Sequence, residues 1–127
     1  MISITGTWIK GFGTAGTFLS HPSYIKQFKE KLGFIPFPGT LNLEVKKEKL
    51  EELKATAENV YMHGFKENRQ EYFGVNCFPC KINGLTAAIV VPDKTTHPEN
   101  IMEVIANEEL VKKFSLQVGD TLIVEVE

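Results

Sequence analysis

Two strand-like segments joined by a two-residue turn restrict the fold of this chain more than any other feature. Residues 70–82 and 85–92 are rich in β-branched, aromatic and other apolar residues, and Asn83-Gly84 separates them. Asn-Gly between two such runs predicts a β-hairpin, because both residues tolerate the positive φ angles of a type I′ turn. Pro79 can interrupt the first strand, whereas the second is almost entirely apolar. The chain therefore contains antiparallel β-structure.

The other segments add short strands and a few helices. Alternation predicts strands over residues 2–9, 40–45, 59–65, 100–106 and 121–126, and helical patterns cover residues 21–32, 46–54 and 108–114. Ser20 is the expected N-cap and Gly33 the expected end of the first helix. The second helix is charged, and we expect it to be a solvated surface. Many short strands with two or three inserted short helices predict a mainly β protein with a small closed barrel.

Composition is that of a globular chain with one domain. The 127 residues are 43% hydrophobic and 24% charged, which predicts one domain spanning residues 1–127. No apolar run approaches the roughly 18 residues of a membrane helix, and the N-terminus lacks the pattern of a signal peptide. With a net charge of −2 and no basic cluster, nucleic acid is a poor candidate partner. We expect a cytoplasmic monomer without a membrane or nucleic-acid partner.

Cys77 and Cys80 have the Cys-x-x-Cys spacing of redox motifs and of half a zinc site. A structural zinc site needs two further ligands, and the sequence has no second pair of cysteines. The two residues also lie in a predicted strand, where side chains three apart face opposite sides. We therefore expect two buried or half-buried thiols without a metal or redox role.

A hydroxyl and an amide lie two residues apart at the start of the strand over residues 40–45. Within Gly39-Thr40-Leu41-Asn42, the side chains of Thr40 and Asn42 point to one face while Leu41 turns to the core. Their oxygens suit a hard cation such as Mg²⁺, which often completes its shell with waters and substrate phosphates. The same tetrapeptide is also an ordinary turn into an amphipathic strand. By itself it leaves both interpretations open.

A glycine-rich segment, Gly-Phe-Gly-Thr-Ala-Gly at residues 11–16, follows the first strand. Glycines permit positive φ and close approach of the backbone, so successive N–H groups can surround phosphate oxygens. The Gly-x-Gly-x-x-Gly spacing is a weak signal alone, because its dinucleotide-binding form requires a strand-turn-helix context that is not evident here. A flexible hairpin loop is the other interpretation.

Five stretches, taken in order along the chain, are similar to one family. They are residues 10–19, KGFGTAGTFL; 37–43, FPGTLNL; 89–97, IVVPDKTTH; 103–106, EVIA; and Gly119-Asp120 before the last strand. Together they resemble the archaeal CTP-dependent riboflavin kinases, over residues 2–126. That family has a closed six-stranded cradle-loop barrel of the RIFT type. It transfers the γ-phosphoryl group of CTP to the ribityl 5′-hydroxyl of riboflavin, giving FMN and CDP, and the resemblance implies the same fold and reaction here.

The resemblance also implies roles for individual residues. Thr40 and Asn42 would hold Mg²⁺, which would neutralise the nucleotide phosphates as the phosphoryl group moves. Thr95 and Glu103 would contact the flavin. The nucleotide site would be formed by Gly11, Phe12, Gly13, Thr14, Ala15 and Gly16, together with Glu108, Glu109, Leu110 and Val111.

Glu103 is the expected general base, because the attacking hydroxyl must lose a proton and a carboxylate within hydrogen-bond reach can accept it. Glu99 and His97 are the competing candidates. The chain departs from the family at Ala15 and Gly16, where glycine and a basic residue are frequent, and at Val111, where arginine is usual, so its nucleotide preference can differ.

The alternative is a non-catalytic barrel of the same class that binds flavin, a nucleotide or DNA. Acidity and the lack of a basic stripe argue against DNA.

Overall fold

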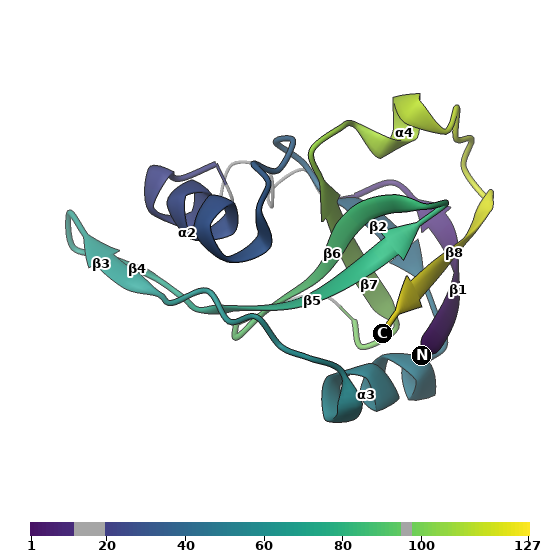
Figure 1. Ribbon diagram of the computed structural model, residues 1–127, viewed down its shortest axis with the longest axis horizontal. Helices are drawn as coiled ribbons and strands as arrows, with labels where there is room; N and C mark the ends of the chain where they lie inside the picture. Colours follow the sequence, from purple (N-terminus) through teal and green to yellow (C-terminus); the bar gives the residue numbers. More distant parts are fainter. Residues whose placement is uncertain (12–19, 95–97) are drawn as a thin grey trace.

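The computed structural model describes residues 1–11, 20–94 and 98–127, and it is a mainly β structure built on a closed barrel (Figure 1). The barrel order is β1-β2-β7-β6-β5-β8, and all its paired strands are antiparallel. Its strands are β1 (Ile2–Ile9), β2 (Leu41–Glu44), β5 (Val75–Ile82), β6 (Leu85–Pro92), β7 (Ile101–Ala106) and β8 (Thr121–Val126). The predicted six-stranded closed barrel is confirmed, and closure removes exposed sheet edges.

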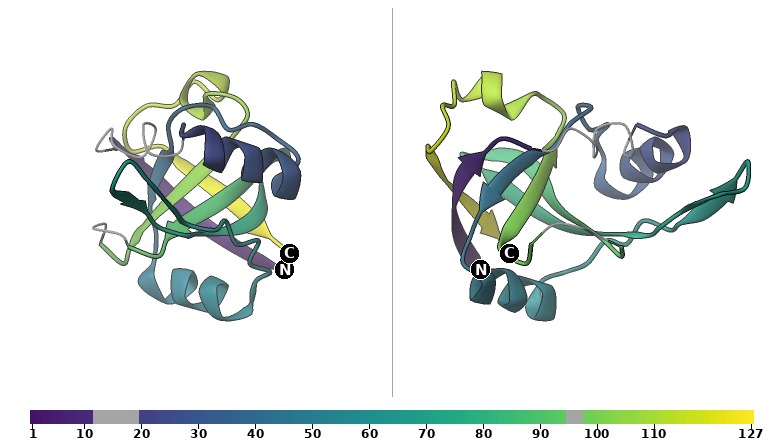
Figure 2. Two further views of the ribbon diagram at one scale, coloured as in Figure 1. Left: turned by 90° about the vertical axis from the view of Figure 1, so that its left-hand side faces the viewer. Right: turned by 180° about the vertical axis from the view of Figure 1, so that it is seen from behind.

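A separate two-stranded hairpin projects from the barrel, as the two further views in Figure 2 show. It consists of β3 (Phe65–Glu67) and β4 (Gln70–Tyr72). The described helices are α2 (Pro22–Leu32), α3 (Lys47–Thr56) and α4 (Leu110–Lys113). None of these helices, which are those of the described residues, is long and apolar enough to cross a membrane.

The predicted β5–β6 hairpin is confirmed. Asn83 and Gly84 both have positive φ, and Pro79 pairs with Ala88 without interrupting its strand. The strand predicted over residues 70–82 is instead divided at Gly74, where a Cβ atom would lie 1.7 Å from the Tyr61 hydroxyl. A larger residue at position 74 would have to displace the Tyr61 hydroxyl, which is bonded to Asp93.

The strand predicted over residues 59–65 was largely wrong. The segment makes an isolated bridge from Met62 to Val75, and regular pairing starts only at Phe65. Gln27 on α2 explains the conformation of this segment. Its Nε2 atom donates to the His63 carbonyl, and its Oε1 atom accepts from the His63 N–H. Side-chain hydrogen bonds thus replace a strand partner.

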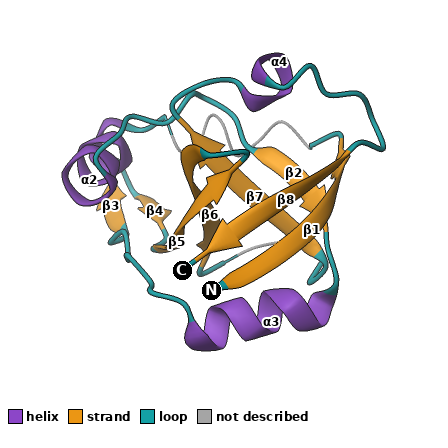
Figure 3. Ribbon diagram, turned by 45° about the vertical axis from the view of Figure 1, so that its right-hand side comes forward, coloured by secondary structure: helices purple, strands orange, loops and turns teal. Residues whose placement is uncertain are grey.

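The helix α3 closes the end of the barrel at which both termini lie (Figure 3). Leu50 and Leu53 of α3 are buried in the same core cluster as Leu43, Ile82 and Val124 of the barrel. The expectation of a purely solvated helix was therefore wrong. The charged side chains face solvent, but two leucines three residues apart share one helix face and bury apolar area against the barrel.

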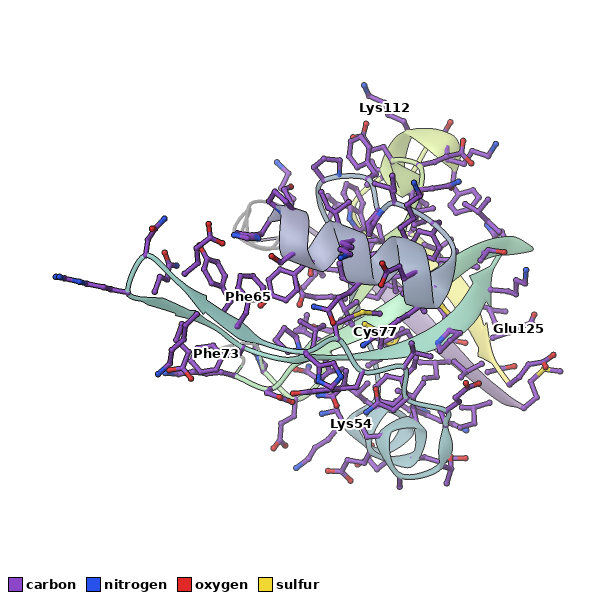
Figure 4. All side chains as sticks on the ribbon, turned by 60° about the vertical axis from the view of Figure 1, so that its left-hand side comes forward. Lys54, Phe65, Phe73, Cys77, Lys112 and Glu125 are labelled. Atoms are coloured by element: carbon purple, nitrogen blue, oxygen red, sulfur yellow. The ribbon has the colours of Figure 1, made fainter. Side chains whose placement is uncertain are left out.

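A second core lies outside the barrel, beneath α2. Tyr24 and Phe28 of α2 are fully buried against Cys77 and Ile105, and Figure 4 shows Cys77 close to this helix. Cys80 belongs to the barrel interior instead, so the two thiols face opposite ways as predicted. Burial raises the pKa of each thiol to about 12, which keeps both protonated and unreactive at neutral pH.

The C-terminal end of α2 was predicted correctly, whereas its N-cap was not. Gly33 has a left-handed conformation (φ 81°), and its N–H bonds the Phe28 carbonyl, as expected for a glycine after a helix. The N-cap is His21 rather than Ser20, because the His21 Nδ1 atom accepts the Ser23 N–H at 3.1 Å. The opposite ring nitrogen lies 2.8 Å from Glu67 Oε2 and ties α2 to the projecting hairpin.

We expect Leu53→Ala to lower the free energy of unfolding by about 2–5 kcal/mol, because it leaves a cavity at the closed end of the barrel. The matched control is Glu52→Ala on the exposed face of α3, which should change it by less than about 0.5 kcal/mol. Urea unfolding followed by far-UV circular dichroism measures both. Equal effects of the two substitutions would contradict the assignment of α3 as the cover of the barrel.

Candidate active site

Asn42 and Glu103 lie directly opposite each other on the paired strands β2 and β7. Their strand neighbours Leu41, Leu43 and Val104 belong to the barrel interior. Side chains alternate along a strand, so Asn42 and Glu103 share the outer face. There they are 4% and 5% exposed, and they are the buried polar residues of the described chain. A buried amide and a buried carboxylate therefore meet outside the barrel.

Thr40 adds a third oxygen to this pair. Its Oγ1 atom lies 3.1 Å from Glu103 Oε1 and 3.5 Å from Asn42 Oδ1. A hydroxyl has one proton to donate, and the shorter contact, to the carboxylate, is the better hydrogen bond. The strand pairing thus gathers a hydroxyl, an amide and a carboxylate oxygen in one place, as the sequence predicted for Thr40 and Asn42.

These oxygens have the chemistry and spacing that a magnesium site requires. Neighbouring ligands of an octahedral Mg²⁺ ion lie about 3 Å apart, since each lies about 2.1 Å from the metal. No group of three or more His, Cys, Asp or Glu side chains among the described residues is arranged to hold a metal. Thr40 and Asn42 fit the expected pair of neutral oxygen ligands, with remaining positions for water or phosphate.

The start of the glycine-rich segment lies against the same cluster. Ile9 pairs with Asn42, and a Cβ atom at Gly11 would lie only 1.9 Å from Asn42 Nδ2. Only glycine fits at this distance, so the backbone of Gly11 passes directly over the Asn42 amide. The other predicted residues of this segment lie outside the described part of the chain: Phe12, Gly13, Thr14, Ala15 and Gly16.

A cavity of about 220 Å³ opens beside Thr40. One wall is formed by residues 37–41 and the other by residues 108–111, and the two segments are about seventy positions apart. The structure therefore brings Thr40 together with the second predicted nucleotide segment. Phe37 and Pro38 also line the first wall, but the sequence analysis did not predict them as site residues. The sequence signal that could have identified them is the apolar segment Pro36-Phe37-Pro38 directly before Gly39.

Two local features fix the walls of this cavity. The Phe37 N–H donates to the Ala106 carbonyl at 2.7 Å, which ties the first wall to the end of β7. In the second wall Leu110 is buried, and it anchors the short helix α4. Glu109 is the N-cap residue of this helix, which begins at Leu110 rather than at the predicted residue 108.

A smaller recess of about 60 Å³ adjoins Glu103. Val90, which pairs with Glu103, lines it together with Pro92 at the end of β6 and Ile101 at the start of β7. Thr40 therefore borders one cavity and Glu103 the other, while their side chains touch each other. This arrangement can hold two different groups on the two sides of one oxygen cluster.

One competitor of Glu103, Glu99, lines the same recess but differs in exposure and pairing. Its side chain is 72% exposed and its carboxylate lies 2.8 Å from Lys47 Nζ. The Lys47 ammonium lowers the pKa of Glu99, which makes this carboxylate a weaker base. His97 and the predicted flavin contact Thr95 lie outside the described residues.

Comparison with known proteins identifies the family. The family model CTP-dep_RFKase, described as a domain of unknown function, DUF120, matches residues 8–126. The chain is 36% identical to a riboflavin kinase of Methanosarcina acetivorans over 99% of this chain and 54% of the relative. It is 40% identical to a riboflavin kinase of Archaeoglobus fulgidus over 98% of this chain and 54% of the relative.

A riboflavin kinase of Ignicoccus hospitalis is 41% identical over 98% of this chain and 71% of the relative. The chain thus spans about half the length of the first two relatives. The family model and these relatives all match nearly the whole chain. The chain belongs to the archaeal CTP-dependent riboflavin kinase family.

Proposed function

We propose that this chain is a CTP-dependent riboflavin kinase, which transfers the γ-phosphoryl group of CTP to the 5′-hydroxyl of riboflavin and releases FMN and CDP. The observation that carries the proposal is the contact of Thr40 with Asn42 and Glu103 between two recesses. Phosphoryl transfer needs a donor and an acceptor on the two sides of a cation-binding, proton-accepting centre. Membership in the family supports the same reaction.

Thr40 and Asn42 would hold Mg²⁺ in this reaction. When bound, the ion supplies positive charge to the transferring phosphates. This chain needs such a charge, because its only arginine is Arg69, which lies in the turn between β3 and β4. Among the described residues, the backbone of Gly11 packs on the Asn42 amide.

Glu103 would act as the general base. In the proposed step the 5′-hydroxyl oxygen bonds to the γ-phosphorus while the bond from this phosphorus to the CDP oxygen breaks. The hydroxyl proton passes to the Glu103 carboxylate, whose Oε1 atom is oriented by the Thr40 hydroxyl at 3.1 Å. A base held in this way needs little reorientation before it accepts a proton.

The cavity beside Thr40 would take the nucleoside end of CTP. Its 220 Å³ volume, the aromatic wall at Phe37 and the polar backbone of residues 108–111 suit a pyrimidine nucleoside. Val111, where arginine is usual in the family, removes a cationic contact from this wall. The preference for CTP is therefore expected to depend on backbone contacts rather than on a side-chain charge.

A donor assay tests the proposed function. The 127-residue chain is incubated with riboflavin, Mg²⁺ and each of CTP, UTP, ATP and GTP in turn, and FMN is separated by chromatography. We expect FMN with CTP and far less with the other three. Tight riboflavin binding without FMN from any donor would instead support a non-catalytic flavin-binding barrel.

We expect Thr40→Ala and Asn42→Ala each to lower the turnover number by about tenfold or more, because each removes a proposed Mg²⁺ ligand. Thr40→Ser keeps the hydroxyl and should retain most activity. The measurement is the rate of FMN formation against Mg²⁺ concentration, with circular dichroism to confirm the fold. Undiminished activity in both alanine variants would refute the metal assignment.

We expect Glu103→Gln to lower the turnover number by about 10²–10⁴-fold with little change in the KM for CTP, because the amide cannot accept the hydroxyl proton. The matched control is Glu99→Gln, whose carboxylate is exposed and paired with Lys47, and it should keep most of the activity. Steady-state rates across pH measure both variants. A larger loss in Glu99→Gln than in Glu103→Gln would transfer the role of base to Glu99.

A further inference from the structure

Helix α3 contributes a lysine to the recess beside Glu103. Lys54, which is labelled on α3 in Figure 4, lines this recess together with Leu50 of the same helix. Residues four apart on a helix share one face, and Leu50 anchors this face because it is buried in the barrel core. The long apolar stem of a lysine can follow such a face while its ammonium stays at the water-accessible end. The helix that covers the barrel therefore also brings a positive charge to the proposed base.

The ion pairs of α3 do not include Lys54. Lys47 Nζ lies 2.8 Å from Glu99 Oε2, and Lys49 Nζ lies 3.7 Å from Glu52 Oε2, whereas Lys54 is in no ion pair with any residue of the described chain. Its charge nevertheless acts at the recess, since the ammonium of Lys47 and, more weakly, that of Lys54 lower the pKa of Glu99. The Lys54 ammonium is thus close to the recess but has not been taken up by a carboxylate there.

The lining of the recess changes its charge during the proposed phosphoryl transfer. Its charged side chains, among the described residues, are Lys54, Glu99 and Glu103, and Glu99 has a counter-charge in Lys47. When Glu103 accepts the proton of the hydroxyl, its negative charge disappears, while Lys54 keeps its positive charge. In the same step the acceptor oxygen gains a phosphoryl group that carries about two negative charges. The lining therefore becomes more positive by one charge as the anion forms beside it.

The recess has the size and the donor chemistry for one phosphate group. Its volume of about 60 Å³ has room for only a few water molecules, so a phosphate fits there whereas a nucleoside does not. A lysine ammonium is a compact charge with three N–H donors on a flexible stem. Its hydrogen bonds to phosphate oxygens are charge-assisted and therefore strong. A lysine can also move with a phosphoryl group as that group changes partners.

Lys54 and the proposed magnesium site lie on different elements around Glu103. Thr40 and Asn42 belong to β2 and the residue before it, and the Thr40 hydroxyl contacts Glu103 Oε1 from the side of the larger cavity. Lys54 borders Glu103 from the smaller recess instead. Two sources of positive charge can therefore act on the two sides of the reacting group, one toward the donor phosphates and one toward the acceptor.

We propose that the Lys54 ammonium binds the transferred phosphoryl group on the acceptor side, where it becomes the 5′-phosphate of FMN. This role rests on the proposed kinase function. It makes Lys54 a catalytic residue supplied by α3, a helix whose buried leucines otherwise serve only to close the barrel.

A comparison of FMN with riboflavin tests this contact, because the two flavins differ only in the phosphate. Lys54→Met keeps the apolar stem and removes the charge. It should raise the Kd for FMN by about tenfold, as expected for the loss of a charge-assisted hydrogen bond, and leave the Kd for riboflavin unchanged. Quenching of flavin fluorescence measures both constants. The turnover number should also fall by about tenfold, with an unchanged KM for CTP.

Two further variants control for charge and for folding. Lys54→Arg keeps a cation and should retain most of the affinity for FMN and most of the turnover. Lys49→Met removes a charge from the same helix at a residue that is paired with Glu52, and it should change neither. Circular dichroism confirms that all three variants are folded.

The outcomes separate the role of Lys54 from the proposed function. FMN formation by the native chain, together with a native Kd for FMN and native turnover in Lys54→Met, would overturn the phosphate contact and leave the kinase assignment standing. An equal rise in the Kd for FMN and for riboflavin, or equal losses in Lys49→Met, would also overturn it. A native chain that forms no FMN from any donor would overturn both. Selective loss of FMN affinity in Lys54→Met, restored in Lys54→Arg, supports the contact.

Discussion

The pairing of β2 with β7 is the constraint on which the candidate site depends. It sets Asn42 opposite Glu103 while Leu41 and Val104 fill the barrel interior. A slip by one residue would turn the leucine outward and bring polar groups into the apolar core. An unpaired carboxylate there costs at least several kcal/mol. The apolar alternation that stabilises the barrel therefore also fixes the geometry of the oxygen cluster.

Features encoded within a few residues were predicted well. The Asn83-Gly84 turn, the left-handed Gly33 and the opposed faces of Cys77 and Cys80 follow from local backbone preferences and strand periodicity. The burial of α3 was not predicted, because charged residues predominate in its sequence and only Leu50 and Leu53 are buried. These two leucines pack against the end of the closed barrel. That partner exists only after strands distant in sequence have paired.

The candidate site also contains residues that were predicted from the sequence and residues that were not. Thr40, Asn42 and Glu103 were singled out from the sequence, and the structure brings them into contact. The cavity wall at Phe37 was not predicted, because Phe37 is far in sequence from residues 108–111, which form the opposite wall. The Phe37 N–H donates to the Ala106 carbonyl at the end of β7, and this bond holds the first wall in place. A cavity between distant segments depends on register and on loop paths, neither of which a local pattern contains.

The two sides of the proposed site also differ in how firmly they are built. Beside Glu103, the small recess is lined by Val90, which pairs with Glu103, and by Pro92 at the end of β6, so the position of Glu103 is set by paired barrel strands. On the nucleotide side, the walls are a loop before β2 and the four-residue helix α4. Loops tolerate substitution better than paired strands. A departure such as Val111 is therefore expected to alter the choice of nucleotide without disturbing the position of Glu103.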